Sequence, residues 1–334
     1  MDRKKVIAGL IGAGRIGKMH ARNITTQLPD VFLKTVADCE PDDKWVNSLG
    51  IPVCAEHCQV VLDDPEIEAV VIATPSATHV DMITAAAKAG KQIFCEKPVA
   101  FEAEKVGQAV AAARDAGVGL QIGFNRRFDP DFRAVRDAVT SGKIGTPHII
   151  RITNRDPVRP ALDFIPDSGG LFMDFSIHDF DMLRFLSGSE VVRVYAAGAV
   201  LIDPEIEKLG DIDTALITLQ LASGALCIID LSRETHYGYD QQVEVFGSEG
   251  SISARNTTPT NTVLSTAQGV FSDQPHYSFV ERYETAFVEE MRAFFTSVRD
   301  GTPPQVTGED AQLAVKIAQA AQDSYKHNQP VEVV

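Results

Sequence analysis

The feature that most constrains the fold is the hexapeptide Gly12-Ala-Gly14-Arg-Ile-Gly17, because of what lies on either side of it. It follows the apolar run KVIAGLIG, typical of a strand covered on both faces, and precedes a helical pattern over residues 15–27. In such a place Gly12 permits a tight turn, Gly14 lets a pyrophosphate approach the backbone, and Gly17 allows close helix–strand packing. The sequence therefore predicts a dinucleotide-binding βαβ unit at its start.

Asp38 indicates which dinucleotide is bound. It ends a second strand pattern over residues 32–38, about 20 residues beyond the glycine motif, where a carboxylate can accept hydrogen bonds from a ribose 2′-hydroxyl. The same carboxylate repels a 2′-phosphate, so NAD is favoured over NADP, although the neighbouring cation of Arg15 leaves NADP open. Arg15 and Ile16 begin the helix whose free N–H groups would receive the phosphates.

The remaining pattern divides the chain in two. Strand patterns at residues 69–74, 92–97 and 119–124 alternate with helical ones around 81–89 and 101–117, which predicts an α/β Rossmann domain over residues 1–124. After a helix at 130–141 come successive strands at 148–156, 191–200, 213–223, 225–235 and 239–254, with Ser223-Gly224 as a hairpin turn. Residues 125–334 are therefore expected to form an α+β domain with a large, mostly antiparallel open sheet. The helices expected at 279–300 and 308–326 have the alternative of packing back on the first domain.

Composition excludes several classes of protein. The formal net charge of −15 argues against a nucleic-acid partner, and no run approaches the roughly 18 apolar residues that span a bilayer. An odd set of five cysteines suits a reducing, cytoplasmic location. Cys54, His57 and Cys58 resemble half of a metal site, but no second ligand pair follows, so no metal is expected.

The stretch SGGLFMDFSIHDFDMLRFLSG, residues 168–188, is apolar enough for a buried helix but carries Asp174, His178, Asp179 and Asp181. On a helix Asp174 and His178, four residues apart, share one face, with Asp181 beside it. These polar residues either line a ligand-filled cleft or form a structural cluster of caps and ion pairs.

Four segments together resemble the glucose-fructose oxidoreductase/inositol dehydrogenase (Gfo/Idh/MocA) family: GLIGAGRIGKMHARNI, ATPSATHVDMITAAAKAGKQIFCEKPVA, GFNRRFDPDF, and Gly169-Gly170 with the following Asp174 and His178. The stretch YGYDQQVEVFGSEG is similar to that of bacterial myo-inositol 2-dehydrogenases. The resemblance implies catalytic residues at Lys97, Asp174 and His178, and a Lys97–Pro98 bond that is commonly cis. It also implies a homo-oligomer, dimer or tetramer, assembled through the open sheet, and cofactor contacts from Thr74, Pro75, His79, Glu96 and Lys97.

The residue types suit alcohol oxidation. An unperturbed histidine has a pKa near 6.5, so His178 can accept the hydroxyl proton, with Asp174 orienting its ring. Lys97, at the carboxyl edge of the parallel sheet, can polarise the substrate hydroxyl or be the base itself. A polyol would find hydrogen-bonding partners beside Lys97, Asp174 and His178 in Arg126, Arg127, Asn154 and Tyr237. Phe175 would also line this site, although the family carries a small hydroxyl residue there, which leaves the identity of the polyol open.

The sequence therefore predicts NAD-dependent oxidation of a secondary alcohol of a cyclic polyol, first of all myo-inositol to 2-keto-myo-inositol. One alternative is a dehydrogenase of another inositol isomer or an aldose. Another is a redox-neutral lyase or glycosidase that recycles its bound NAD. A non-catalytic NAD-sensing regulator would be expected to lack the lysine–histidine pair.

Overall fold

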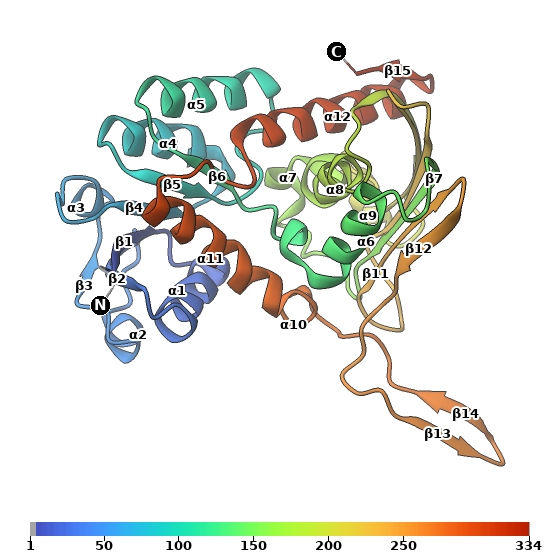
Figure 1. Ribbon diagram of the computed structural model, residues 1–334, viewed down its shortest axis with the longest axis horizontal. Coiled ribbons are helices and arrows are strands. Elements are labelled where there is room, and N and C mark those ends of the chain that lie inside the picture. Colours follow the sequence, from blue (N-terminus) through green and yellow to red (C-terminus); the bar gives the residue numbers. More distant parts are fainter. Residues whose placement is uncertain (1–4, 334) are drawn as a thin grey trace. The chain divides into compact units, whose positions relative to one another are not determined.

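The computed structural model describes residues 5–333, which divide into two compact units (Figure 1). The first unit comprises the chain up to Phe128 together with Thr285–Val315. The second unit comprises Asp129–Glu284 and the chain from Lys316 onward. The helix α12 (Gly308–His327) contributes its first residues to one unit and its remaining residues to the other.

The first unit contains a six-stranded sheet in the order β3-β2-β1-β4-β5-β6, with every neighbouring pair parallel. Its strands are β1 (Val6–Ile11), β2 (Val31–Ala37), β3 (Val53–Ala55), β4 (Ala69–Ile72), β5 (Gln92–Cys95) and β6 (Leu120–Ile122). Its helical segments are α1 (Arg15–Gln27), α2 (Asp43–Ser48), α3 (Gln59–Leu62), η1 (Ser76–Thr78), α4 (His79–Lys88), α5 (Ala103–Asp115), η2 (Asn125–Phe128) and most of α11 (Glu284–Asp300). The strand order reverses between β1 and β4, which is the position where such sheets bind dinucleotides, so the predicted Rossmann architecture is confirmed.

Helices cover both faces of this sheet, and the burial of its strands follows from that. Figure 1 shows α4 and α5 on one side, with α1 and α11 on the other. Apolar side chains of α1 and α11, among them Ile24, Met291 and Phe294, share one core cluster with Leu10 and Val71 of the sheet. All four residues of β4 are buried, as expected for a strand with no solvent-facing side.

The second unit contains a seven-stranded sheet in the order β12-β11-β7-β10-β9-β8-β15. Its strands are β7 (Pro147–Arg155), β8 (Val191–Ala199), β9 (Thr214–Leu221), β10 (Leu226–Ser232), β11 (Asp240–Gly247), β12 (Gly250–Ala254) and β15 (Val331–Glu332). Its helical segments besides α12 are α6 (Pro130–Thr140), α7 (Ile165–Ser168), η3 (Leu171–Phe175), α8 (Ile177–Ser187), α9 (Pro204–Lys208) and α10 (Phe279–Arg282). Among the described strands of this sheet only the β7–β10 pair is parallel, so the predicted mostly antiparallel sheet is confirmed.

The predicted hairpin at Ser223-Gly224 joins β9 to β10, as expected. Residues 239–254, however, are not one strand. They form the antiparallel pair β11 and β12, because the chain reverses at Ser248 and Glu249 between two glycines. The sheet has one solvated face: side chains along β9 and β10 alternate between buried and partly or fully exposed.

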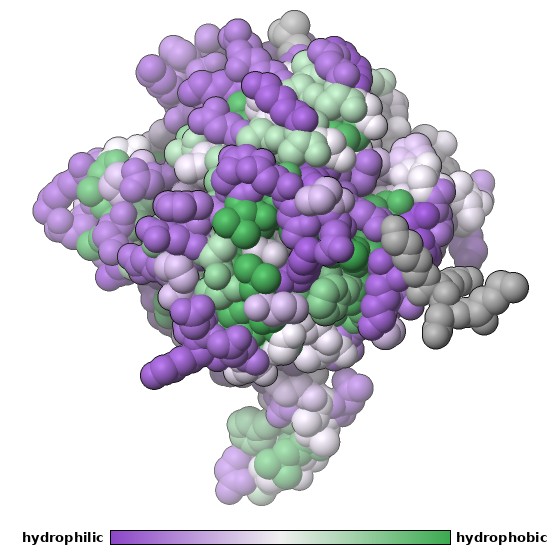
Figure 2. Space-filling view, turned by 90° about the vertical axis from the view of Figure 1, so that its left-hand side faces the viewer, coloured by the Kyte–Doolittle hydropathy of each residue, from purple (hydrophilic) through white to green (hydrophobic). Residues whose placement is uncertain are grey.

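A hairpin not foreseen in the sequence, β13 (Val263–Thr266) and β14 (Gly269–Ser272), projects from the second unit (Figure 1). Its apolar side chains Val263, Leu264, Val270 and Phe271 are exposed, and the projecting segment carries hydrophobic surface in Figure 2. Across residues 5–333 no helix has the length and apolar character needed to cross a membrane.

Candidate active site

The glycine turn of the first unit has the geometry that its motif predicts. Gly12, directly after β1, has φ +94°, and a Cβ there would lie 2.5 Å from the carbonyl oxygen of Ala73. A Cβ on Gly17 would lie 1.9 Å from the carbonyl oxygen of Gly12, so that glycine permits the close approach of α1 to the turn. At Gly14, by contrast, a Cβ would meet no heavy atom of the described residues within 4 Å beyond its immediate chain neighbours, which leaves open space beside the backbone at the start of α1. Arg15 is exposed and Ile16 half-buried at the same helix terminus.

Asp38 lies against this turn. One oxygen of its carboxylate accepts a hydrogen bond from the backbone N–H of Ala13, and the other accepts one from the N–H of Glu40 at 2.9 Å. The carboxylate is thus held at the carboxyl end of β2, beside the glycine turn, where it is partly exposed. Open space at Gly14, a helix N-terminus and a fixed carboxylate together fit the phosphates and ribose of a dinucleotide.

Lys97 follows β5 at the same edge of the sheet and is half-buried. The N–H of Glu96 donates to the carbonyl of Ile72 on the neighbouring strand at 3.0 Å, which carries the sheet register up to the lysine. The Lys97–Pro98 bond is cis, as the family resemblance implies.

His79 supports this edge of the sheet through contacts with the backbone. Its Nδ1 lies 2.8 Å from the carbonyl oxygen of Pro98 and its Nε2 lies 2.8 Å from that of Thr74, so its ring joins the segments that follow β5 and β4. Burial lowers the pKa of His79, against the raising effect of the two carbonyl oxygens and of Glu96. Because its side chain is buried and both nitrogens face the backbone, His79 braces the loops that carry Thr74, which is half-buried, and Pro75, which is exposed.

Glu96 is also turned to a supporting position. Its Oε1 lies 2.6 Å from Nε2 of His20, a buried residue of α1, and its side chain is 13% exposed.

Arg126 is buried, and Arg127 forms an ion pair with Asp310 at 2.9 Å within the same unit. The structure therefore gives Arg127 a partner within the chain that the sequence did not suggest.

In the second unit the segment with Asp174 and His178 is not one regular α-helix, so the predicted helix is wrong in its geometry at Asp174. Leu171–Phe175 forms a π-helical turn, in which the Ser176 N–H donates to the carbonyl of Leu171 at 3.0 Å, and α8 begins at Ile177. Within residues 171–183 only Asp174 and His178 are partly exposed, and every other side chain is buried. Such π-turns occur frequently at functional sites, where they redirect side chains.

Arg233, which follows β10, is a residue that the sequence did not single out. Its side chain is 1% exposed, and its guanidinium contacts two carboxylates: Oδ2 of Asp211 at 3.2 Å and Oδ2 of Asp174 at 3.8 Å. The guanidinium also lies over the ring of Phe175, 5.7 Å from its centroid. Asp211 in turn accepts a hydrogen bond from the N–H of Leu171 at 2.9 Å, which ties the start of the π-turn to the same cation.

Asn154 and Tyr237, which the sequence also predicted at the substrate, form hydrogen bonds within the second unit. Asn154 is fully buried: its amide nitrogen donates to Oδ2 of Asp179 at 2.6 Å, and its oxygen accepts from Gln241. Tyr237 is 40% exposed, and its hydroxyl donates to Oδ2 of Asp240 at 2.7 Å. Asn154 thus anchors α8 to the sheet, whereas Tyr237 stands at the surface.

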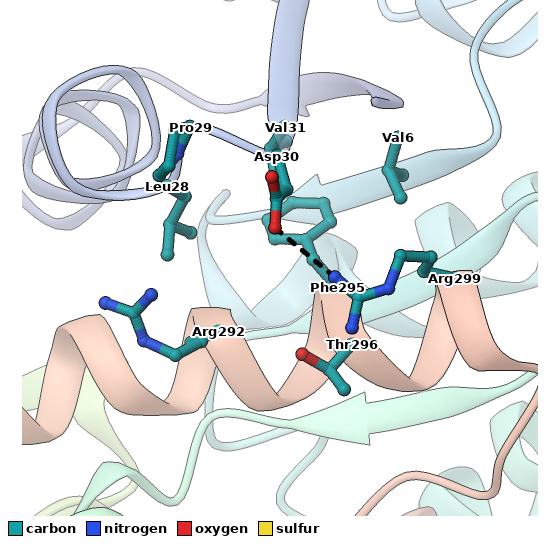
Figure 3. A pocket seen from close by; sticks show the side chains of 9 residues that line it. All are labelled: Val6, Leu28, Pro29, Asp30, Val31, Arg292, Phe295, Thr296 and Arg299. Carbon is teal, nitrogen blue, oxygen red and sulfur yellow. Dashed lines mark hydrogen bonds and ion pairs between the residues drawn. The ribbon is translucent and has the colours of Figure 1, made fainter. Parts of the chain in front are cut away.

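A small pocket in the first unit is separate from these groups (Figure 3). It is lined by the first residues of β1 and β2, Val6 and Val31, and by Arg292 and Arg299 of α11, with Arg299 paired to Asp30 at 3.4 Å. Because Gly12 and Asp38 follow the opposite, carboxyl ends of the same strands, this pocket is not the dinucleotide site.

Comparison with known proteins bears on both units. A family model described as "Oxidoreductase family, NAD-binding Rossmann fold" matches residues 6–124, and that family's "C-terminal alpha/beta domain" matches residues 136–333. The myo-inositol 2-dehydrogenase of Thermotoga maritima is 42% identical over 97% of this chain and 98% of its own. The scyllo-inositol 2-dehydrogenase (NAD(+)) of Bacillus subtilis is 38% identical over 98% of this chain and 96% of its own.

Among solved structures, the scyllo-inositol dehydrogenase of Lactobacillus casei with bound NAD(H) and scyllo-inositol superposes with a TM-score of 0.92. It is 31% identical, and the match covers 99% of each chain. Family models and relatives thus agree over nearly the whole sequence. The chain belongs to the glucose-fructose oxidoreductase/inositol dehydrogenase (Gfo/Idh/MocA) family, and its first domain is an NAD-binding Rossmann domain.

Proposed function

We propose that this NAD-dependent oxidoreductase oxidises a ring hydroxyl of an inositol, and that myo-inositol is converted to 2-keto-myo-inositol. The observation that carries the proposal is the full-length likeness to inositol 2-dehydrogenases, in a chain that keeps Lys97, Asp174 and His178. Asp174 and His178 are the two side chains of an otherwise buried segment that reach the surface, and a ligand-facing role accounts for that exposure.

NAD fits the carboxyl edge of the first unit. The backbone at Gly12, Gly14, Arg15 and Ile16 would receive the pyrophosphate, and Asp38 would accept hydrogen bonds from the adenosine ribose. Thr74 and Pro75 would border the nicotinamide ribose, with His79 and Glu96 as supports behind them. Bound NAD would supply the hydride acceptor for the substrate carbon.

The protein side chains then have to orient the substrate and take up a proton. In the proposed mechanism His178 accepts the hydroxyl proton, while Asp174 holds the imidazole ring and stabilises its protonated form. Lys97 donates a hydrogen bond to the same hydroxyl and favours its developing negative charge. Arg233 keeps the Asp174 carboxylate in place. The reverse assignment, with Lys97 as the base, uses the same groups.

Substrate hydroxyls away from the reacting carbon would meet Tyr237, which is 40% exposed. Of the other residues placed there from the sequence, Arg127 and Asn154 have partners within the chain, and Arg126 and Phe175 are buried, so we assign these four to the walls and supports of the site.

A second candidate substrate is scyllo-inositol, which differs from myo-inositol in the orientation of one hydroxyl. The likeness to the Bacillus subtilis and Lactobacillus casei enzymes favours it specifically. The test is a panel of myo-inositol, scyllo-inositol and aldoses with NAD and with NADP, followed at the absorbance of reduced nicotinamide. Reduction of NAD by myo-inositol above all other substrates is expected, and absence of turnover with every inositol would refute the proposal. NADH-like absorbance on adding substrate without NAD would instead indicate the cofactor-recycling lyase or glycosidase.

We further propose that the chain works in the cytoplasm as a homo-oligomer. The solvated face of the second sheet exposes Leu216, Leu226 and Phe246 at 53%, 57% and 44%. Leu226 and Phe246 both pair with Ile149 on β7, so they are neighbours on one face. Leu216 pairs with Asp230 and lies further along the same sheet. An apolar row formed by Leu226, the half-buried Ile149 and Phe246 on an open sheet suits burial against a second copy.

A further inference from the structure

Three ionisable side chains meet beneath Lys97, in the interior of the first unit. They are His20 of α1, Glu96 after β5 and Glu290 of α11, and they place one nitrogen or oxygen atom each within 4.8 Å of one another. His20 and Glu290 are fully buried. Glu96 precedes Lys97 directly, so whatever fixes Glu96 also fixes the main chain that leads to the lysine.

The hydrogen bonds of this cluster are incomplete in a specific way. His20 and Glu96 contact each other through Nε2 and Oε1 at 2.6 Å, which suits an N–H donor on His20 and a carboxylate on Glu96. With the proton on Nε2, Nδ1 of His20 is an acceptor, and it has no partner among the described residues. Both carboxyl oxygens of Glu290 are likewise buried without a partner. The cluster therefore has acceptors to spare and lacks a donor.

A proton on Glu290 supplies the missing donor. The surroundings favour this proton, because they are apolar. The rings of Phe94 and Phe287 lie edge-on to the His20 ring, with centroid distances of 5.4 and 6.1 Å, and Phe294 packs on Phe94. Burial in this apolar environment, and then the negative charge of Glu96, raise the pKa of Glu290 well above its usual range. The other titratable groups close by are His20 and, next to Glu96, the buried Cys95 thiol, whose pKa is also raised by burial.

A bound metal ion explains the cluster less well. Ligands on one metal at about 2.0–2.2 Å are usually near 3 Å or more apart, and the 2.6 Å between His20 and Glu96 is a hydrogen-bond distance. We propose that Glu290 is a positioning residue, which carries a proton at neutral pH and, as an uncharged donor, keeps Glu96 on His20 and the Lys97 main chain in place. The link to Lys97 chemistry rests on the proposed function, whereas the proton on Glu290 does not.

The chain offers a matched control one residue away. Glu289 lies on the exposed side of the same helix, where it pairs with Arg292 at 3.2 Å. The first measurement is the infrared spectrum of the wild-type protein at pH 7.5, where exposed carboxyl groups are ionised. A carboxylic-acid C=O band is expected, present in Glu289→Gln and lost in Glu290→Gln. A wild-type spectrum without that band overturns the proposal, and this refuting outcome needs neither substrate nor a folded variant.

Stability against pH gives a second, independent readout. Because the folded protein holds this proton more tightly than the unfolded chain, the wild type loses stability relative to Glu290→Gln as the pH rises above about 4.3. The melting temperature of Glu290→Gln minus that of the wild type should rise by at least about 5 °C between pH 5 and pH 8. A difference that stays constant with pH, or one equivalent of divalent metal in the wild type that Glu290→Gln loses, overturns the proposal.

The positioning role is tested by what each replacement can donate. Glutamine keeps an N–H donor and methionine fills similar volume without one, so Glu290→Gln should keep kcat within about twofold and Glu290→Met should lose about tenfold or more. The KM for NAD should stay within about twofold in both, because the glycine turn and Asp38 are untouched. Equal kcat in the two variants overturns the positioning role. Absence of inositol turnover in the wild type would refute the proposed function and leave the infrared and pH results standing.

Discussion

Replacing Arg233 with methionine tests whether the Asp174 carboxylate depends on a buried cation. The substitution roughly keeps the side-chain volume but removes the guanidinium that contacts Asp211 at 3.2 Å and Asp174 at 3.8 Å. It also removes the cation that lies over the Phe175 ring. The carboxylates of Asp211 and Asp174, whose side chains are 9% and 20% exposed, would then remain without this cation.

The expected cost follows from the burial of the arginine. Removing one partner of a buried ion pair destabilises a protein by about 3–5 kcal/mol, because the remaining charge stays buried. In a folding unit of this size each kcal/mol lowers the melting temperature by roughly 2–4 °C, so a drop on the order of 10 °C is expected. Arg193→Met is the control: Arg193 pairs with Glu332 at 2.7 Å, but both side chains are more than half exposed. A surface pair contributes about 0–1 kcal/mol, so its melting temperature should fall by no more than about 4 °C.

Calorimetry of both variants measures the stability, and steady-state kinetics measures the site. Arg233→Met should lower kcat by at least about tenfold, because a displaced Asp174 no longer orients His178, while the KM for NAD should stay within about twofold. An Arg233→Met protein that melts within about 2 °C of the wild type with unchanged kcat would refute the assigned role of this arginine.

Four further outcomes are expected. Lys97→Ala and His178→Ala should each lower turnover by roughly a hundredfold or more while NADH still binds, as read from its fluorescence, and near-normal turnover in either would contradict its role. Asp38→Ser should raise the ratio of kcat/KM for NADP over NAD by about tenfold or more, and an unchanged ratio would remove the case for the ribose contact. Burial opposes the ionisation of Asp213, but hydrogen bonds from backbone N–H groups outweigh burial and lower the pKa of this carboxyl group. The ionised Asp213 therefore contributes stability at pH values above the ordinary aspartate pKa of about 3.9, and this contribution is lost as the pH falls further. Asp213→Asn should therefore be less stable than the wild type at pH 7, with a gap that closes below about pH 4 in thermal melts. Leu226→Asp should reduce the oligomer mass in light scattering, and an unchanged mass would exclude that face as the interface.

Much of the fold was predictable because its signals are local. The glycine turn depends on three glycines within six residues and on a strand and helix that adjoin them, and the structure shows the expected backbone at Gly12 and Gly17. Buried parallel strands and half-exposed antiparallel strands have different apolar patterns, so the change of architecture after the first domain was also readable. The separation of β11 from β12 was missed, because apolar alternation continues on both sides of a short turn.

The residue types of the candidate site could be predicted from the sequence, but the residues that support them could not. Glu290 lies in the apolar stripe of α11 with Phe287, Met291 and Phe294, and that spacing was a readable sign of a buried carboxyl group. Its partners His20 and Glu96 are far away in sequence, and Arg233 follows a strand like many solvated arginines. Nothing local distinguishes a buried cation from an exposed one.

The sequence by itself determined the nucleotide fold, the preference for NAD and the types of the side chains proposed as catalytic, because these depend on neighbours along the chain. Only the tertiary structure decided which polar groups reach the surface and which support them from inside. Asp174 lies on a π-helical turn, Asn154 donates a hydrogen bond to the buried Asp179, and Glu96 contacts His20. These positions could not be predicted, because the partners that bury and bind each side chain come from segments that only folding brings together.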